Sequence, residues 1–171
     1  MELVEPSVEL YGSFRGCFAE MEELEERLPA GCGLASPEEA DSPDVVRTLV
    51  DAAHTVQHDG WVTSSNYWII SGGEVAGFIN LRHALTPALL DLYGHIGYSV
   101  RPSYRRRGIA GRALGEVVRR AGERGMDRVL VCCENNNEAS RRVIVANGGE
   151  LEDIRRDPAG PLVERYWISI S

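Results

Sequence analysis

The sequence contains no apolar run that approaches the ~20 residues needed to cross a membrane bilayer. Its opening stretch, MELVEPSVEL, also lacks the basic segment followed by an apolar segment that marks an export signal. We therefore expect a cytoplasmic protein with no membrane partner. The apolar fraction of 43% and the charged fraction of 26% are typical of a globular protein.

The sequence also lacks a recognisable cysteine pattern. The four cysteines, Cys17, Cys32, Cys132 and Cys133, are spaced neither as zinc ligands nor as a disulfide framework. Cys132 and Cys133 end the apolar run 129–133, which is typical of a buried strand, so we interpret them as small core residues. A catalytic thiol is the less favoured alternative.

Metal-ligating side chains are sparse as well. His54 and His58 are four residues apart, a spacing that two metal ligands on one helix face can have. No third ligand accompanies them, so a solvated helix face is the favoured interpretation. We expect no metal.

The net charge of −8 argues against a general nucleic-acid binder, because contacts to phosphates need a basic face. Arginines nevertheless cluster locally, within 101–112 and at 141–142. A basic pocket on an acidic protein suits a small polyanion better than a long duplex. The acidic remainder would weakly attract a cationic amine.

The chain of 171 residues is most simply one domain, and helix and strand patterns alternate along it. This order predicts a mixed α/β sheet with helices on both faces. Gly72-Gly73 indicates a hairpin turn, and Ser42-Pro43 is typical of a helix start. The conformation of 86–92 is left open. The expected helices are 9–28, 43–53, 109–125 and 137–147, and the expected strands are 67–70, 75–81, 95–100, 129–133, 150–156 and 162–170.

The most informative stretch is 94–112, GHIGYSVRPSYRRRGIAGR. It predicts a strand, a break at Pro102, and an arginine-glycine loop that opens directly into a helix. The first N–H groups of a helix have no internal partner and lie at the positive end of its dipole. A phosphate can bind there, and Gly108 and Ala110 carry so little side chain that it could approach the backbone closely.

This stretch resembles the main cofactor-binding motif of the GNAT acyltransferases. In that motif an Arg or Gln is followed three residues on by Gly and five residues on by Gly or Ala. A second match follows at the next strand-to-helix junction, and the resemblance covers about 68–170. The plainer interpretation, a solvated basic turn, does not explain why the motif matches at both strand-to-helix junctions. The matching positions are Arg105, Gly108 and Ala110, then Val100 and Pro102, then Asn137-Glu138-Ala139-Ser140, and Gly148-Gly149.

The resemblance implies a mostly antiparallel sheet whose two central strands, 95–100 and 129–133, are parallel and splay apart. The pantetheine arm of coenzyme A lies in that gap in the family, bound by free backbone groups of the first strand. Residues 1–60 would form a helical acceptor-side region and 66–171 a cofactor-binding core. The implied activity is direct N-acetyl transfer from acetyl-CoA, a cosubstrate, to an amine.

The resemblance also implies which residues bind the cofactor. The basic loop would hold the pyrophosphate, the strand before it would pair with pantetheine through its backbone, and the second junction would contact the pantetheine arm and the ribose phosphate. In that order these are Arg105, Arg106, Arg107, Gly108, Ile109, Ala110 and Gly111; Tyr98, Ser99 and Val100; and Asn137, Ser140 and Arg141.

The catalytic residues are less clear, because the family's thiolate-protonating tyrosine corresponds to Ile144 here. Tyr166 on the last strand is the proposed substitute. His95 is the first candidate for the base, with an ordinary pKa of ~6.5, although a His satisfied within the core is an equal alternative. Glu134, at the end of a central strand, is the second candidate, with an exposed loop carboxylate as its plainer interpretation.

The acceptor is expected to be a small-molecule amine or a protein amine, bound near Trp61, Asn66 and Tyr67. A narrow-specificity enzyme that modifies a protein or an antibiotic is one alternative. The rival from a different class is a non-catalytic acyl-CoA-binding module, which the isoleucine at position 144 keeps open. A homodimer is common in such folds.

Overall fold

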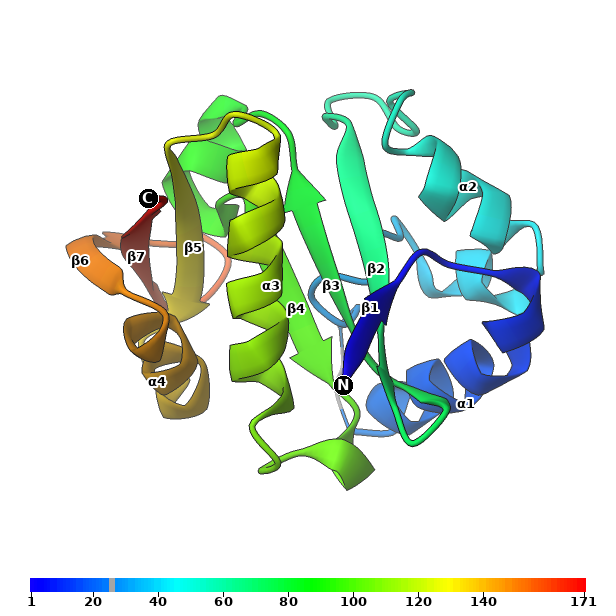
Figure 1. Cartoon of the computed structure of the whole chain (residues 1–171). Coiled ribbons are helices and arrows are strands. Elements are labelled where there is room, and N and C mark those ends of the chain that lie inside the picture. The colour runs from blue at the N-terminus through cyan, green and yellow to red at the C-terminus, as the bar shows by residue number, and fades with distance from the viewer. Residues whose placement is uncertain (25–26) are drawn as a thin grey trace.

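A seven-stranded sheet organises the chain, with strands in the order β1-β2-β3-β4-β5-β7-β6 (Figure 1). The computed structural model describes residues 1–24 and 27–171. Neighbouring strands are antiparallel except β4 and β5, so the expected mixed, mostly antiparallel sheet with a central parallel pair is confirmed. The strands are β1 (Glu2–Val4), β2 (Ser64–Ser71), β3 (Glu74–Arg82), β4 (Ile96–Val100), β5 (Arg128–Glu134), β6 (Gly149–Arg156) and β7 (Leu162–Ser169). The helices are α1 (Tyr11–Glu22), α2 (Val45–Asp51), α3 (Ile109–Glu123) and α4 (Glu138–Ala146).

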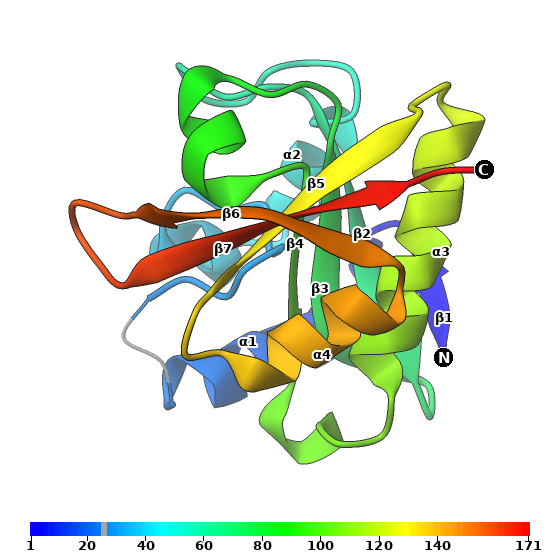
Figure 2. The ribbon, with the colours of Figure 1, turned by 90° about the vertical axis from the view of Figure 1, so that its left-hand side faces the viewer.

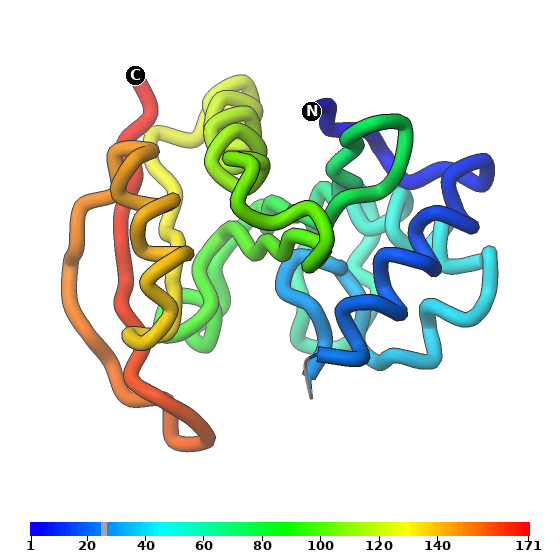
Figure 3. The backbone as a smooth tube through the Cα atoms, turned by 90° about the horizontal axis from the view of Figure 1, so that it is seen from below, coloured from blue at the N-terminus to red at the C-terminus, as the bar shows by residue number. Residues whose placement is uncertain are grey.

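Helices cover both faces of the sheet, as the order of elements predicts (Figures 1, 2 and 3). On one face, α3 and α4 contribute residues such as Leu114 and Ile144 to a core shared with β3, β4, β5 and β7. On the other face, α1 and α2 pack residues such as Phe14 and Leu49 against Trp68 and Phe78. None of the helices in the described ranges combines the length and the apolar character needed to cross a membrane.

The two parallel strands diverge from a single contact point. Among the described residues, β4 and β5 share one register pair, Ile96 with Val131. His95 closes the vertex, because its N–H donates to the Leu130 carbonyl at 2.7 Å. Beyond Ile96 the edge of β4 that faces β5 pairs with no strand of the part of the chain that the structure describes, so the splay expected for these strands is present.

The predicted hairpin and helix ends are confirmed where local chemistry decides them. Gly72 and Gly73 have φ of 62° and 80°, which matches a two-residue turn between β2 and β3. Gly125 and Gly148 follow α3 and α4 with φ of 83° and 84°, the left-handed conformation that ends many helices.

Other boundaries differ from the predictions. The helix expected over 9–28 contains α1, which ends at Glu22; residues 25 and 26 of that prediction lie outside the described residues. Ser42-Pro43 forms a turn of i→i+3 hydrogen bonds just before α2, whose N-cap is Asp44. The unassigned stretch 86–92 leads into a π-helical turn at Leu89–Tyr93. The short edge strand β1 was not predicted.

Candidate active site

The start of α3 has the geometry expected for anion binding. Gly108 is its N-cap, with φ of 69°, and no side chain caps the helix. A Cβ built on Gly108 would meet nothing within 4 Å, so the space beside the first helical turn is open. Ala110 and Gly111 continue that turn with little side chain, whereas the Ile109 side chain is buried in the core.

The arginines before α3 form hydrogen bonds within the loop and also give it a positive charge. Arg105 Nε donates to the Val100 carbonyl at 2.9 Å, and Arg107 donates to the Ser103 carbonyl at 3.1 Å. Arg107 also lies over the Tyr104 ring, 5.1 Å from its centroid. All three loop arginines, Arg105, Arg106 and Arg107, are exposed. The structure thus brings the predicted residues 105–111 together around one helix end.

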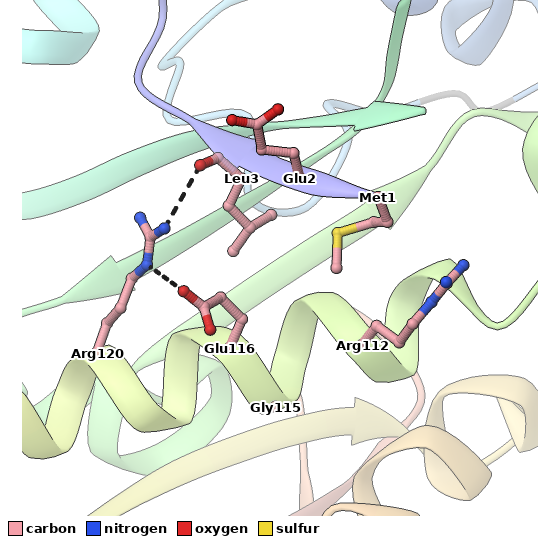
Figure 4. Close-up of a pocket in the computed structure, with 7 residues that line it drawn as sticks. All are labelled: Met1, Glu2, Leu3, Arg112, Gly115, Glu116 and Arg120. Carbon is pink, nitrogen blue, oxygen red and sulfur yellow. Dashed lines mark hydrogen bonds and ion pairs between the residues drawn. The ribbon is translucent and has the colours of Figure 1, made fainter. Parts of the chain in front are cut away.

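Residues 105–111 are called the cradle below. A shallow hollow borders the cradle on the side of β1 (Figure 4). Arg120 spans it, donating to the Leu3 carbonyl at 3.4 Å and to Glu116 at 3.0 Å. Arg112 lines the same hollow and donates to the Arg107 carbonyl at 3.3 Å, so the hollow and the basic loop share a wall.

The second junction faces the splay from the start of α4. Asn137 caps α4, because its Oδ1 accepts a hydrogen bond from the Ser140 N–H at 3.1 Å. The Ser140 hydroxyl lies 2.6 Å from the Tyr98 hydroxyl on β4. Ser99 and Val100 pair with Phe78 and Gly77 of β3, so their other backbone edge faces the splay.

Arg141 has partners that its predicted role did not anticipate. Its guanidinium binds the Glu164 carboxylate in a bidentate manner, at 2.7 and 2.8 Å, and also contacts the Asn135 carbonyl. A contact to a ribose phosphate would therefore require Arg141 to exchange partners. The hydrogen bond from Arg141 lowers the pKa of Glu164. The Tyr166 hydroxyl donates a hydrogen bond to the same carboxylate at 2.7 Å. Burial, with a smaller contribution from this hydrogen bond, raises the pKa of Tyr166 to about 12.

His95 lies at the vertex of the splay and is only 7% exposed. Its Nδ1 accepts a hydrogen bond from the Leu130 N–H at 2.8 Å, which places the ring proton on Nε2. Burial, with a smaller contribution from the Arg82 charge, lowers the pKa of His95 from 6.5 to about 4. In this arrangement the ring holds β4 against β5, and no lone pair remains to take a proton from a substrate.

This geometry predicts a pH-dependent contribution to stability. His95 is neutral in the folded protein above about pH 4 but protonated below 6.5 when unfolded. The unfolded state therefore binds more protons in that window, and the free energy of unfolding should rise with pH between 4 and 6.5. Urea unfolding of wild type and His95→Asn across this range measures the contribution, which the variant should lose. His54→Asn, at an exposed position, is the control; an equal change of slope there would contradict the assignment to His95.

Glu134 ends β5 and faces the side of the sheet opposite α4, because Cys133 before it points into the core beneath α4. Its carboxylate forms an ion pair with Arg27, from the connection after α1. The side chain of Glu134 is 25% exposed and that of Arg27 is 73% exposed. The pair therefore joins the two sides of the splay at the surface.

The three predicted acceptor residues are not brought together. The Asn66 amide donates to the Leu49 carbonyl beneath α2, whereas Tyr67, on the opposite face of β2, lies under Arg120 of α3 at 4.6 Å. Trp61 is 40% exposed and packs edge-on against His58, with ring centroids 4.6 Å apart. Alternation along the strand explains the split between Asn66 and Tyr67.

Sequence reasoning missed the contact that covers β4 on the acceptor side. Gly31 and Gly33, with φ of 80° and 77°, carry the connection after α1 across the sheet. A Cβ on Gly31 would lie 2.4 Å from the Gly97 carbonyl oxygen, so only glycine fits there. The signal was present as the Gly-Cys-Gly triplet, but its partner, β4, is distant in the sequence. In the described ranges, no group of three or more His, Cys, Asp or Glu side chains is placed to hold a metal ion.

Comparisons with known proteins bear on the family and the fold of the chain. The acetyltransferase (GNAT) family matches residues 36–148. No curated protein sequence matches the chain significantly. The structure of RimL, a ribosomal L7/L12 alpha-N-protein acetyltransferase in complex with coenzyme A, is 21% identical, with a TM-score of 0.70 over 98% of this chain and 93% of that one.

Two further solved structures resemble the fold at similar levels. RimJ from Mycobacterium smegmatis, in complex with a CoA disulfide, is 20% identical, with a TM-score of 0.70 over 98% of this chain and 80% of that one. The microcin C7 self-immunity acetyltransferase MccE, in complex with acetyl-CoA and AMP, is 15% identical, with a TM-score of 0.67 over 98% and 91%. At these identities the likeness shows the fold.

Proposed function

Because the chain belongs to the GNAT acetyltransferase family, we propose that it is an N-acetyltransferase that moves an acetyl group from acetyl-CoA to an amine. The transfer is direct, without an acyl-enzyme intermediate. A protein amine is the acceptor class that we place first. RimL, a protein of the same fold that is described as a ribosomal L7/L12 alpha-N-protein acetyltransferase, supports this choice.

The proposal rests on one observation, that the unpaired edge of β4 leads to the N-terminus of α3. The free edge of β4 begins beyond Ile96 and leads toward the open N-terminus of α3 at Gly108. An extended arm with amide groups can pair with a free strand edge, and a phosphate can bind at the helix start. The pantetheine arm and the pyrophosphate, which are adjacent in coenzyme A, therefore each have a complementary surface, in the order in which the molecule joins them.

The residues of the chain would divide the work as follows. The N–H groups at 109–111 and the arginines at 105–107 would bind the pyrophosphate, and the Asn137 region would contact the pantetheine arm. Backbone N–H groups on the splayed part of β4 could stabilise the charge that develops on the thioester oxygen. We assign proton acceptance from the amine to Glu134 in preference to His95, because the Nδ1 of His95 is engaged by Leu130.

The acceptor would approach from the face opposite α3. Residues 27–34 and the turn between β6 and β7 both lie on that side (Figure 3). Glu134 faces the same side, where its carboxylate, which forms an ion pair with Arg27, would take the proton from the acceptor ammonium group. Gly31 covers β4 at Gly97, so the acceptor amine would enter beside this contact.

The test is acceptor-dependent release of CoA with three acceptors. The first is a peptide with a free α-amine, the second is the same peptide with a blocked N-terminus and one lysine, and the third is a small polyamine. We expect the first to be acetylated fastest, as measured by mass spectrometry of the acceptor and chromatography of CoA. The chain has no lysine, so acetylated lysine cannot come from the protein itself. Binding of acetyl-CoA without transfer to any acceptor would contradict the proposal and favour a non-catalytic module.

A further inference from the structure

The Tyr98 hydroxyl joins the two sides of the splay. Tyr98 lies on β4, two residues beyond the Ile96–Val131 pair, and its ring packs against the core beneath α3 and α4. The hydroxyl lies 2.6 Å from Ser140 Oγ and 3.4 Å from the Ser140 carbonyl oxygen, in the first turn of α4. It is therefore placed on the cofactor side of the gap.

The other hydroxyl groups considered for the leaving-group proton are engaged differently. Ile144, at the position where the family resemblance would place a tyrosine, is fully buried and has no proton to give. The Tyr166 hydroxyl donates a hydrogen bond to Glu164, which also forms an ion pair with Arg141. Tyr104, on the loop before α3, donates to Glu74. Tyr98 differs because its partner is a neutral hydroxyl.

We infer that Tyr98 is the catalytic acid that protonates the departing CoA thiolate, with Ser140 as the group that returns a proton to Tyr98. The inference rests on the proposed N-acetyltransferase function. As the carbon–sulfur bond breaks, the electron pair stays on sulfur and takes the Tyr98 proton. The resulting phenolate regains a proton through the Ser140 hydroxyl from solvent, and the proton lost by the amine leaves on the acceptor side.

The environment of the pair keeps the proton on Tyr98 until charge develops on the sulfur. Burial raises the pKa of Tyr98 to about 12, so its hydroxyl carries a proton throughout the neutral range, and return of a proton through Ser140 drives the transfer to completion. Ser140 lies in the first turn of α4, where the helix dipole is positive. Negative charge that develops on the sulfur or on the phenolate is stabilised at that end of the helix.

The first experiment compares Tyr98→Phe with Tyr11→Phe, because each change removes one hydroxyl and keeps the ring. The Tyr11 hydroxyl donates to the Ala40 carbonyl on the other face of the sheet. For Tyr98→Phe we expect kcat with acetyl-CoA to fall about 100-fold, the lower range for loss of a general acid. The KM for acetyl-CoA and the Kd for CoA should stay within about threefold, because the hydroxyl acts after binding. Tyr11→Phe should keep kcat within the same threefold range. An unchanged kcat in Tyr98→Phe would overturn the inference.

A second donor separates an acid from a structural residue. The acetyl thioester of an arenethiol releases a thiolate that needs no proton, so wild type and Tyr98→Phe should transfer acetyl from it at equal rates. An equal loss with both donors would show that Tyr98 only positions the site and would overturn the inference. If wild type gives no acceptor-dependent turnover with acetyl-CoA, the proposed function itself fails, whereas turnover that is insensitive to Tyr98→Phe refutes only the acid.

Discussion

Replacing Gly108 with leucine is expected to lower the affinity for acetyl-CoA about 100-fold while leaving the fold intact. The side chain would project into the open space beside the first turn of α3, where no described atom outside the adjoining residues lies within 4 Å of a Cβ. A bulky group there separates the helix N–H groups from a phosphate. Loss of two charge-assisted hydrogen bonds of about 1.5 kcal/mol each gives roughly this factor. Calorimetric titration with acetyl-CoA measures the change.

Gly125 provides the matched control at the other end of the same helix. It also has a left-handed φ, 83°, and an open space around its Cβ position. Both Gly108→Leu and Gly125→Leu should lose roughly 1–2 kcal/mol of stability from the strained backbone. Only Gly108→Leu should lose acetyl-CoA binding. Equal affinities in the two variants would contradict the assignment of the cradle.

The second prediction concerns the stability of the domain beneath α4. Glu164 is 6% exposed and accepts hydrogen bonds from Arg141 and Tyr166. Glu164→Gln keeps the shape of the side chain but removes the charge, so Arg141 loses its ionic partner. Breaking a fully buried pair destabilises a protein by ~3–5 kcal/mol. The Arg141 side chain is 35% exposed, and solvent screens part of the interaction, so we expect a loss of about 2 kcal/mol at neutral pH.

The pH dependence of this loss identifies its cause. Arg141 lowers the pKa of Glu164 below its ordinary value of 4.5, so the ionised carboxylate stabilises the fold above that pH. The stabilisation disappears as pH falls through the lower pKa of the folded state. The difference between wild type and Glu164→Gln in urea unfolding should therefore be constant from about pH 6 to 8 and should shrink below 4.5.

Glu138→Gln is the control on the same helix. Glu138 forms an exposed i,i+4 pair with Arg142, and such pairs contribute at most about 0.5 kcal/mol. A comparable loss in the two variants, or a difference at Glu164 that persists in acid, would contradict the ionic explanation.

The sequence predicted the local structure of the proposed cofactor side because short-range rules determine it. The strand that ends before Pro102, the glycine at position 108 and the apolar spacing of α3 are encoded within one continuous stretch. The same holds for the Asn137 cap of α4, whose hydrogen bond to Ser140 spans three residues. Neither assignment required knowledge of a distant partner.

The rest of the site depends on contacts between distant segments. The hydrogen bond between the Tyr98 and Ser140 hydroxyls joins residues that are 42 positions apart in the sequence. The Arg141–Glu164 ion pair joins α4 to the last strand. Sequence patterns carry no information on which arginine meets which carboxylate across a sheet. For the same reason Trp61, Asn66 and Tyr67 were grouped as one pocket, although the structure places Asn66 and Tyr67 on opposite faces.

The measurement that tests the central claim most directly is calorimetric titration of the wild-type protein with acetyl-CoA. The proposed cradle and splay predict one-to-one binding that weakens as salt is raised, because arginines contribute to it. They also predict that CoA competes for the same site. Absence of binding at low salt, with the protein folded, would contradict the assignment of residues 105–111 and of the N-acetyltransferase function that rests on it.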